Sequence, residues 1–167
     1  RLEQIAPSLY TFVDNHDENR IASKLIRKSD LFPVWLCLMT LPGIPSIYYG
    51  SEWGLEGSRT STSDEALRPA LSVWDGKTYH CQLTDFIRRA VQLHIREEAF
   101  HSGKYQELYL TNRQYAYSRY CETSTVITAL NNDENSAEFD IPVPSGFQKA
   151  ICLTEEMEPV PVINGTL

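Results

Sequence analysis

One short segment of the chain, residues 14–20, gathers side chains that could bind a sugar or take part in catalysis. It reads DNHDENR, so that the imidazole of His16 stands beside the carboxylate of Asp17, and Arg20 follows three residues later. Such a group can hold sugar hydroxyls or assist a proton transfer. It can equally cap a following helix, because Asp, Asn and Glu often accept hydrogen bonds at helix starts. The residue types alone leave both interpretations open.

The segments on either side predict how this group is positioned. Residues 9–13 are short, β-rich and apolar, which is typical of a strand covered on both faces. Residues 32–41 predict a buried helix that Ser29 or Asp30 can cap. Residues 44–49 predict a second buried strand, and a strand, helix and strand in this order imply a parallel sheet. The polar segment would then lie at the end of the first strand.

The rest of the chain predicts a long loop, a helix and a β domain. Residues 51–82 are rich in Gly, Ser, Thr and Asp, and loops of that length are usually functional or disordered. Apolar residues at helical spacing predict an amphipathic helix over residues 84–99. Short alternating segments then predict antiparallel strands. These are residues 105–110, 115–120, 125–131, 138–141 and 149–153. Because the last residues form a turn that normally leads to another strand, we expect this domain to be truncated.

Composition and charge exclude several classes of protein. The 15 Lys and Arg against 22 Asp and Glu give a net charge of −7, which would repel the phosphate backbone of a nucleic acid. The longest apolar stretch, residues 31–41, is shorter than the ~20 residues that a membrane span needs. The four cysteines lack the spacing of a zinc site, and we expect all four to be reduced, with Cys37 buried. Nucleic acid and membrane are therefore not expected as partners.

Three motifs resemble one family. The segment FVDNHD, residues 12–17, resembles the fourth short sequence region of the α-amylase superfamily, glycoside hydrolase family 13. The segment PGIPSIYYGSEWG, residues 42–54, is similar to the eighth barrel strand of those enzymes and the loop after it. Residues 64–69, DEALRP, with the Trp-Asp pair at 74–75, resemble elements of the cyclomaltodextrinase and neopullulanase branch. Their order and spacing agree over residues 9–100, and the sequence is therefore identified as a C-terminal fragment of a family member.

For the fold, the resemblance implies an α/β part followed by an all-β part. Residues 1–103 would be the C-terminal portion of a TIM (β/α)8 barrel, made of its seventh and eighth strand–helix units. Residues 104–167 would be the antiparallel β-sandwich domain that follows the barrel in this family. A complete barrel takes ~250 residues, so the chain would carry only part of one.

For the chemistry, the resemblance implies retaining cleavage of α-1,4 and α-1,6 glucosidic bonds. Such enzymes use a carboxylate nucleophile and a separate carboxylic acid about 5 Å apart. By match to the motif, Asp17 is a third carboxylate that stabilises the transition state, and His16 donates a hydrogen bond to the same sugar. Asp64 and Arg68 match positions that contact sugars on the non-reducing side of the bond. The alternative for this last pair is an ion pair that only braces the loop.

The nucleophile and the general acid are not found in the sequence. The nucleophile's pattern, G-x-R-x-D, is absent, since residues 57–61 begin correctly but carry Ser61 where the Asp should be. We therefore expect the fragment alone to be inactive and to need the missing N-terminal part of the same enzyme as its partner. Glu52 matches a family glutamate that supports the loop, whereas Ser51 stands where an Asp is common. Trp53, Trp74 and Tyr49 could stack on glucose or lie beneath the loop.

The implied substrate is an α-glucan oligosaccharide such as a maltodextrin, cyclodextrin or pullulan, and the implied location is cytoplasmic. No cofactor and no metal are expected in this fragment, and calcium in the missing part stays open. An open apolar sheet edge could also make the chain a homodimer. The alternative function is a non-catalytic α-amylase-like scaffold, or a carbohydrate-binding or structural domain. The intact pair of His16 and Asp17 favours the enzyme, because a scaffold does not need it.

Overall fold

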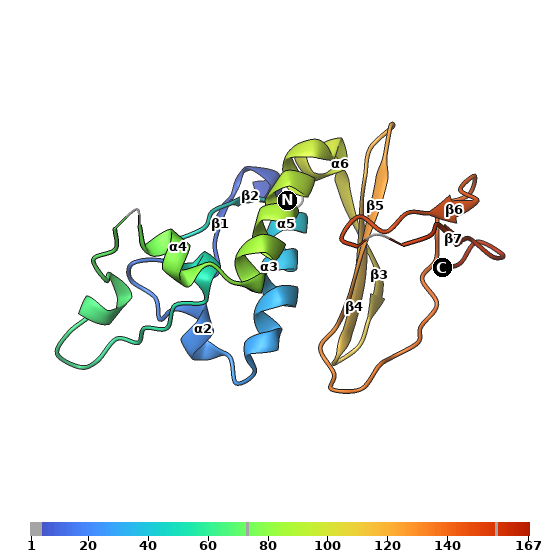
Figure 1. Cartoon of the computed structure of the whole chain (residues 1–167). Helices are drawn as coiled ribbons and strands as arrows, with labels where there is room; N and C mark the ends of the chain where they lie inside the picture. The colour runs from blue at the N-terminus through green and yellow to red at the C-terminus, as the bar shows by residue number, and fades with distance from the viewer. Residues whose placement is uncertain (1–4, 73, 156) are drawn as a thin grey trace. The chain divides into compact units, whose positions relative to one another are not determined.

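The computed structural model describes residues 5–72, 74–155 and 157–167, which form two compact units (Figure 1). The first unit ends at His94 and the second begins at Ile95. This boundary precedes residue 103, where the sequence places the end of the barrel portion. The assignment of the two parts to a barrel end and a family β domain stays a prediction.

The first unit is mainly helical and contains one short parallel strand pair. Its helices are α2 (Ile21–Lys24), α3 (Leu31–Thr40), α4 (Asp75–Tyr79) and α5 (Gln82–Arg96), the last of which runs into the second unit. Its strands are β1 (Tyr10–Thr11) and β2 (Ile44–Pro45). Its 3-10 turns are η1 (Ala6–Ser8), η2 (Lys28–Asp30), η3 (Ser51–Trp53) and η4 (Glu65–Leu67).

Helix α3 confirms the predicted buried helix to within one residue at each end. Its N-cap is Asp30, as predicted, but the side chain makes no capping hydrogen bond. The Asp30 carboxylate instead pairs with the guanidinium of Arg27 at 2.9 Å. The helix ends at Thr40, just before Pro42 and Gly43. Cys37 is half-buried on this helix, so the prediction of a buried Cys37 was wrong.

The core of the first unit lies between α3 and α5. Trp35, Leu38 and Met39 of α3 belong to the same buried cluster as Ile87 and Ala90 of α5. Each large apolar side chain buried in this way contributes roughly 1.5–3 kcal/mol to stability. The helix predicted over residues 84–99 is therefore present with the predicted apolar face. It is interrupted near its end, because α5 stops at Arg96 and a separate short helix follows.

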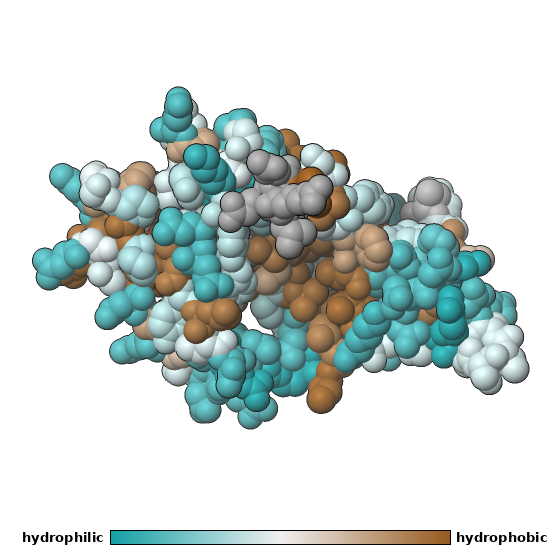
Figure 2. All heavy atoms as spheres, turned by 180° about the vertical axis from the view of Figure 1, so that it is seen from behind, coloured by the Kyte–Doolittle hydropathy of each residue, from teal (hydrophilic) through white to brown (hydrophobic). Residues whose placement is uncertain are grey.

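The two strands pair in parallel, as predicted, but they are short and exposed. Tyr10 lies opposite Ile44, and the ladder is only two residues long. Tyr10 is 66% exposed and Ile44 54% exposed. The prediction that these strands are covered on both faces was therefore wrong for this chain. Hydrophobic side chains gather on the surface of the first unit, brown in Figure 2.

The second unit consists of short antiparallel strands after helix α6 (Glu98–His101). Strands β3 (Lys104–Leu110), β4 (Gln114–Tyr120) and β5 (Thr125–Asn131) form one antiparallel sheet in that order, which confirms three predicted strands. Strands β6 (Lys149–Ala150) and β7 (Val160–Pro161) form a second antiparallel pair.

Two strand predictions in the second unit were wrong. Residues 138–141 form no strand, although Ile141 exchanges two backbone hydrogen bonds with Leu167 at 3.0 Å. The pairing continues only as an isolated bridge between Pro142 and Thr166, beyond which the N–H of Val143 donates to the carbonyl of Gly165 at 2.9 Å. The strand predicted over residues 149–153 is limited to the two residues of β6, where Lys149 lies opposite Pro161 and Ala150 opposite Val160.

Among the described residues, no helix is long and apolar enough to cross a membrane. Within the same ranges, no group of three or more His, Cys, Asp or Glu side chains could hold a metal ion. The four cysteines are free thiols.

Candidate active site

The polar segment after β1 is held by the side chains of two of its own residues. The side-chain oxygen of Asn15 accepts hydrogen bonds from the backbone N–H groups of Asp17 and Glu18 at 2.8 and 2.9 Å. The carboxylate of Asp14 accepts the N–H of Ile21, the first residue of α2, at 2.8 Å. The capping interpretation is thus correct for Asp14, whereas Asn15 closes the turn over residues 15–18 and caps no helix. It leaves the side chain of Asp17 free for another role.

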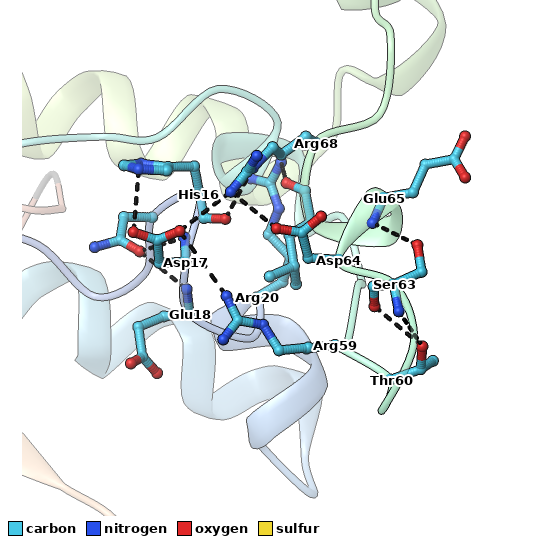
Figure 3. Close-up of polar contacts among 12 residues, drawn as sticks. His16, Asp17, Glu18, Arg20, Arg59, Thr60, Ser63, Asp64, Glu65 and Arg68 are labelled. Carbon is cyan, nitrogen blue, oxygen red and sulfur yellow. Dashed lines mark hydrogen bonds and ion pairs between the residues drawn. The ribbon is translucent and has the colours of Figure 1, made fainter.

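Arg68 brings together the residues that the sequence singled out (Figure 3). One nitrogen of its guanidinium, Nη2, lies 3.1 Å from Asp17 Oδ1 and 2.9 Å from Asp64 Oδ2. Its Nε donates to the backbone carbonyl of His16 at 3.1 Å. Asp17 comes from the segment after β1, whereas Arg68 and Asp64 come from the long loop about 50 residues later in the sequence. The four candidate residues therefore form one cluster.

His16 and Asp17 point to solvent in this cluster. His16 Nε2 lies 3.2 Å from Asp17 Oδ2, and both side chains are 59% exposed. Exposed groups of this kind keep most of their water, so a sugar could approach both of them. The same exposure means that their ion pairs contribute little to stability, typically about 0–1 kcal/mol each.

Arg59 is a member of the cluster that the sequence analysis did not identify. Its guanidinium lies 3.9 Å from Asp17 Oδ1, and its backbone N–H donates to the side chain of Asn19 at 2.8 Å. Residues 57–61 stand out in the sequence only as an incomplete nucleophile pattern. A signal was present nonetheless, because Arg59 is a cation in the same polar loop as Arg68. Two carboxylates and two guanidinium groups therefore balance their charges at this site.

The pair of Asp64 and Arg68 fits both interpretations that the sequence left open. Its i,i+4 ion pair is formed, as the loop-bracing interpretation requires. Arg68 also contacts Asp17 and His16, which a brace within the loop alone would not do. The cluster thus offers charged donors and acceptors to a polyhydroxyl ligand.

Residues after β2 support the loop beneath this cluster. The Tyr49 hydroxyl donates to the carbonyl of Pro69 at 3.0 Å, and the carbonyl of Glu52 accepts from Thr84 at 3.1 Å. Trp53 stacks on Tyr79 with ring centroids 5.5 Å apart. These contacts join the segment after β2 to the loop and to helices α4 and α5.

One aromatic side chain near the loop, Trp74, differs from one of the two interpretations that the sequence left open. Trp74 is 70% exposed, so it does not lie beneath the loop. Lys77 lies 5.4 Å above that ring. Burial raises the pKa of the neighbouring Tyr48 phenol above its ordinary value.

Comparison with known proteins supports one family. The sequence model of the family described as alpha amylase, catalytic domain, matches residues 3–124. A cyclomaltodextrin glucanotransferase from Bacillus sp. (strain 1-1) is 31% identical over 128 residues, which are 75% of this chain and 17% of the relative. Neopullulanase 2 from Thermoactinomyces vulgaris is 27% identical over 159 residues, covering 92% of this chain and 26% of the relative.

A solved structure gives the same result. The debranching enzyme of Nostoc punctiforme superposes with a TM-score of 0.73 at 26% identity, covering 90% of this chain and 30% of that structure. The chain thus spans about a quarter or less of the curated relatives named above. Since the family model matches most of the chain, and the motif residues His16, Asp17, Asp64 and Arg68 meet in one cluster, the chain belongs to the α-amylase family, glycoside hydrolase family 13.

Proposed function

We propose that this chain is the C-terminal part of a retaining glycoside hydrolase that acts on α-1,4- and α-1,6-glucans. The observation that carries the proposal is the contact of Arg68 with both Asp17 and Asp64, beside His16. Substrates named for the relatives, cyclomaltodextrins and pullulan, belong to the same chemical class. The substrate would be an α-glucan oligosaccharide.

In this proposal Asp17 and His16 hold the sugar ring at which the bond is cleaved. Positive charge develops on that ring as it approaches an oxocarbenium ion. Asp17 would stabilise this charge, and its hydrogen bonds to sugar hydroxyls would replace part of its pairing with Arg59 and Arg68. Asp64 and Arg68 would contact the neighbouring sugar on the non-reducing side. The exposed side chains of the cluster can make these exchanges without unfolding the loop.

The finer fold is part of the same proposal. Strands β1 and β2 would be the seventh and eighth strands of a TIM barrel, with the site at their carboxyl ends, where barrel enzymes place catalysis. The antiparallel strands after residue 103 would be the family's C-terminal β-sandwich. The exposed apolar surface of β1 and β2 would be covered by further barrel strands in the complete enzyme. In the chain alone, it would favour self-association.

The nucleophile and the general acid would come from other strands of the barrel. The chain alone would therefore not hydrolyse α-glucans, and the rest of the enzyme would be its obligatory partner. We further propose a cytoplasmic enzyme whose C-terminal part needs no cofactor.

The test is the stereochemistry of the product formed by the complete protein. Purified protein is mixed with maltotriose, a cyclodextrin or pullulan, and the anomeric protons of the first products are followed by NMR. The proposal predicts that α-anomers appear first and convert to the equilibrium mixture later. Release of β-anomers would refute retention. Failure to cleave any of the three substrates would favour the alternative of a non-catalytic scaffold.

A further inference from the structure

Arg20 is a buried cation close to the candidate site, and the proposed function gives it no part. It follows Asp17 by three residues and is 0% exposed. Its Nη1 donates to the carbonyl of Tyr49 at 2.7 Å, and its Nη2 donates to the carbonyl of Leu67 at 2.9 Å. The guanidinium also lies 4.3 Å from the centre of the Tyr48 ring. One side chain therefore joins the segment after β2 to the long loop.

The backbone of Arg20 holds the other end of the same loop. Its N–H donates to the carbonyl of Gly57 at 2.9 Å. Gly57 packs so closely that a Cβ there would lie 2.2 Å from the carbonyl oxygen of Ala66 and 3.2 Å from Cγ of Arg20. The loop is thus closed on itself between residues 57 and 67, and Arg20 contacts both ends of it. Arg68, which pairs with Asp17, follows directly after Leu67.

The charge of Arg20 is balanced through a neutral side chain. The hydroxyl of Ser51 accepts from Nη1 of Arg20 at 3.0 Å and donates to the carboxylate of Asp14 at 2.8 Å. Asp14 is 1% exposed. Within the described residues no ion pair joins Arg20 directly to a carboxylate, and its Nε has no partner. A buried charge with carbonyl and hydroxyl partners is stable only when this geometry is kept.

We propose that Arg20 is a positioning residue that fixes the loop of residues 57–68 against the Asp17 segment. It holds Arg59, Asp64 and Arg68 in the orientation in which they face Asp17, and it does so through the carbonyls of Gly57 and Leu67. Arg20 touches no substrate. The hydrogen bonds from Arg20 to Ser51 and from Ser51 to Asp14 hold the guanidinium beside the segment that carries His16 and Asp17. The effect on substrate rests on the proposed function, whereas the effect on the loop does not.

The first test measures amide hydrogen exchange in the complete protein by mass spectrometry. Lysine cannot make the forked contacts of a guanidinium. Arg20→Lys should therefore speed amide exchange in residues 57–68 by about tenfold, with α3 and α5 unchanged. The matched control is Arg119→Lys. Arg119 is 1% exposed and donates to the carbonyls of Phe100 and Gly103 in the other unit. The control should leave exchange in residues 57–68 unchanged.

A second variant keeps the test decisive if Arg20→Lys unfolds the first unit. Ser51→Ala removes only one hydrogen bond of Arg20 and its link to Asp14. It should speed amide exchange in residues 57–68 by a smaller factor than Arg20→Lys does. The proposal is overturned if exchange in residues 57–68 stays at the wild-type rate in both variants. It is also overturned if Ser51→Ala speeds exchange equally in the loop and in α3.

The third measurement uses kinetics of the complete protein. A displaced loop should affect the outer sugar, which Asp64 and Arg68 would hold. Arg20→Lys should lower kcat/KM for maltotriose by on the order of 10²-fold, but kcat/KM for a nitrophenyl α-glucoside much less. Equal losses on both substrates would contradict the positioning role. If the wild-type protein cleaves neither substrate, the proposed function fails, and the exchange measurements still decide the role of Arg20.

Discussion

Replacing Asp17 by asparagine separates a catalytic role from a structural one. Asparagine keeps the size of the side chain but removes its charge. Asp17 is 59% exposed and pairs with Arg68 at 3.1 Å, Arg59 at 3.9 Å and His16 at 3.2 Å. Exposed pairs of this kind are typically worth about 0.2–1 kcal/mol each. We expect Asp17→Asn to lower the free energy of unfolding by about 1–2 kcal/mol at most, and the melting temperature by only a few degrees.

The expected loss of turnover is far larger. If Asp17 stabilises the positive charge of the transition state, losing its charge should lower kcat by about 10³-fold or more, which corresponds to about 4 kcal/mol of barrier. Both quantities are measured on the complete protein, with a maltooligosaccharide as substrate and thermal unfolding in the same buffer.

The neighbouring carboxylate provides the matched control. Glu18 is similarly exposed and pairs with Lys24 at 3.1 Å, outside the cluster. Glu18→Gln should leave kcat within about twofold of wild type. The reasoning is refuted if Asp17→Asn turns over at near-normal rates, or if it loses activity only to the extent that it unfolds.

Three further predictions concern the outer sugar, the isolated chain and the thiols. Arg68→Ala should raise KM for long maltodextrins more than for maltose, because short substrates do not reach the outer positions; equal effects would mean that Arg68 only braces the loop. The isolated 167-residue chain should show no turnover of a nitrophenyl maltooligosaccharide, and its mass in solution should exceed the 19.1 kDa of one copy. Turnover that co-purifies with the chain and disappears in Asp17→Asn would contradict this. Hydrogen bonds from Thr123 lower the pKa of the Cys121 thiol, so its thiolate forms at a lower pH; iodoacetamide at neutral pH should modify Cys121 faster in wild type than in Thr123→Val, as measured by mass spectrometry.

Local patterns predicted the two longest helices well, but not the short helices α2, α4 and α6. Helix α3 is bounded by residues whose chemistry is visible in the sequence, namely Asp30 before it and Pro42 after it. The apolar face of helix α5 can be predicted from the spacing of the apolar residues in its sequence alone. The extent of a strand depends on its neighbour, and this explains the errors at β1 and β2. Their ladder is two residues long, and no other described strand pairs with either of them.

The candidate site was predicted only in part, because motif matching finds residue types and not their contacts. It singled out Asp17, Asp64 and Arg68, which the structure brings together. It missed Arg59, whose contact with Asp17 depends on how the loop folds back. The carbonyls held by Arg20 lie 29 and 47 residues away in the sequence. Backbone acceptors carry no residue signature, and therefore no pattern could predict these contacts.

The most direct test of the proposed active site is a crystal structure of the complete protein with an inhibitory maltooligosaccharide analogue bound. Asp17 and His16 should each lie within hydrogen-bond distance, about 2.7–3.2 Å, of hydroxyls on one sugar ring. Asp64 and Arg68 should contact the next ring on the non-reducing side. A ligand bound elsewhere, with the contacts of Arg68 to Asp17 and Asp64 unchanged, would contradict the account.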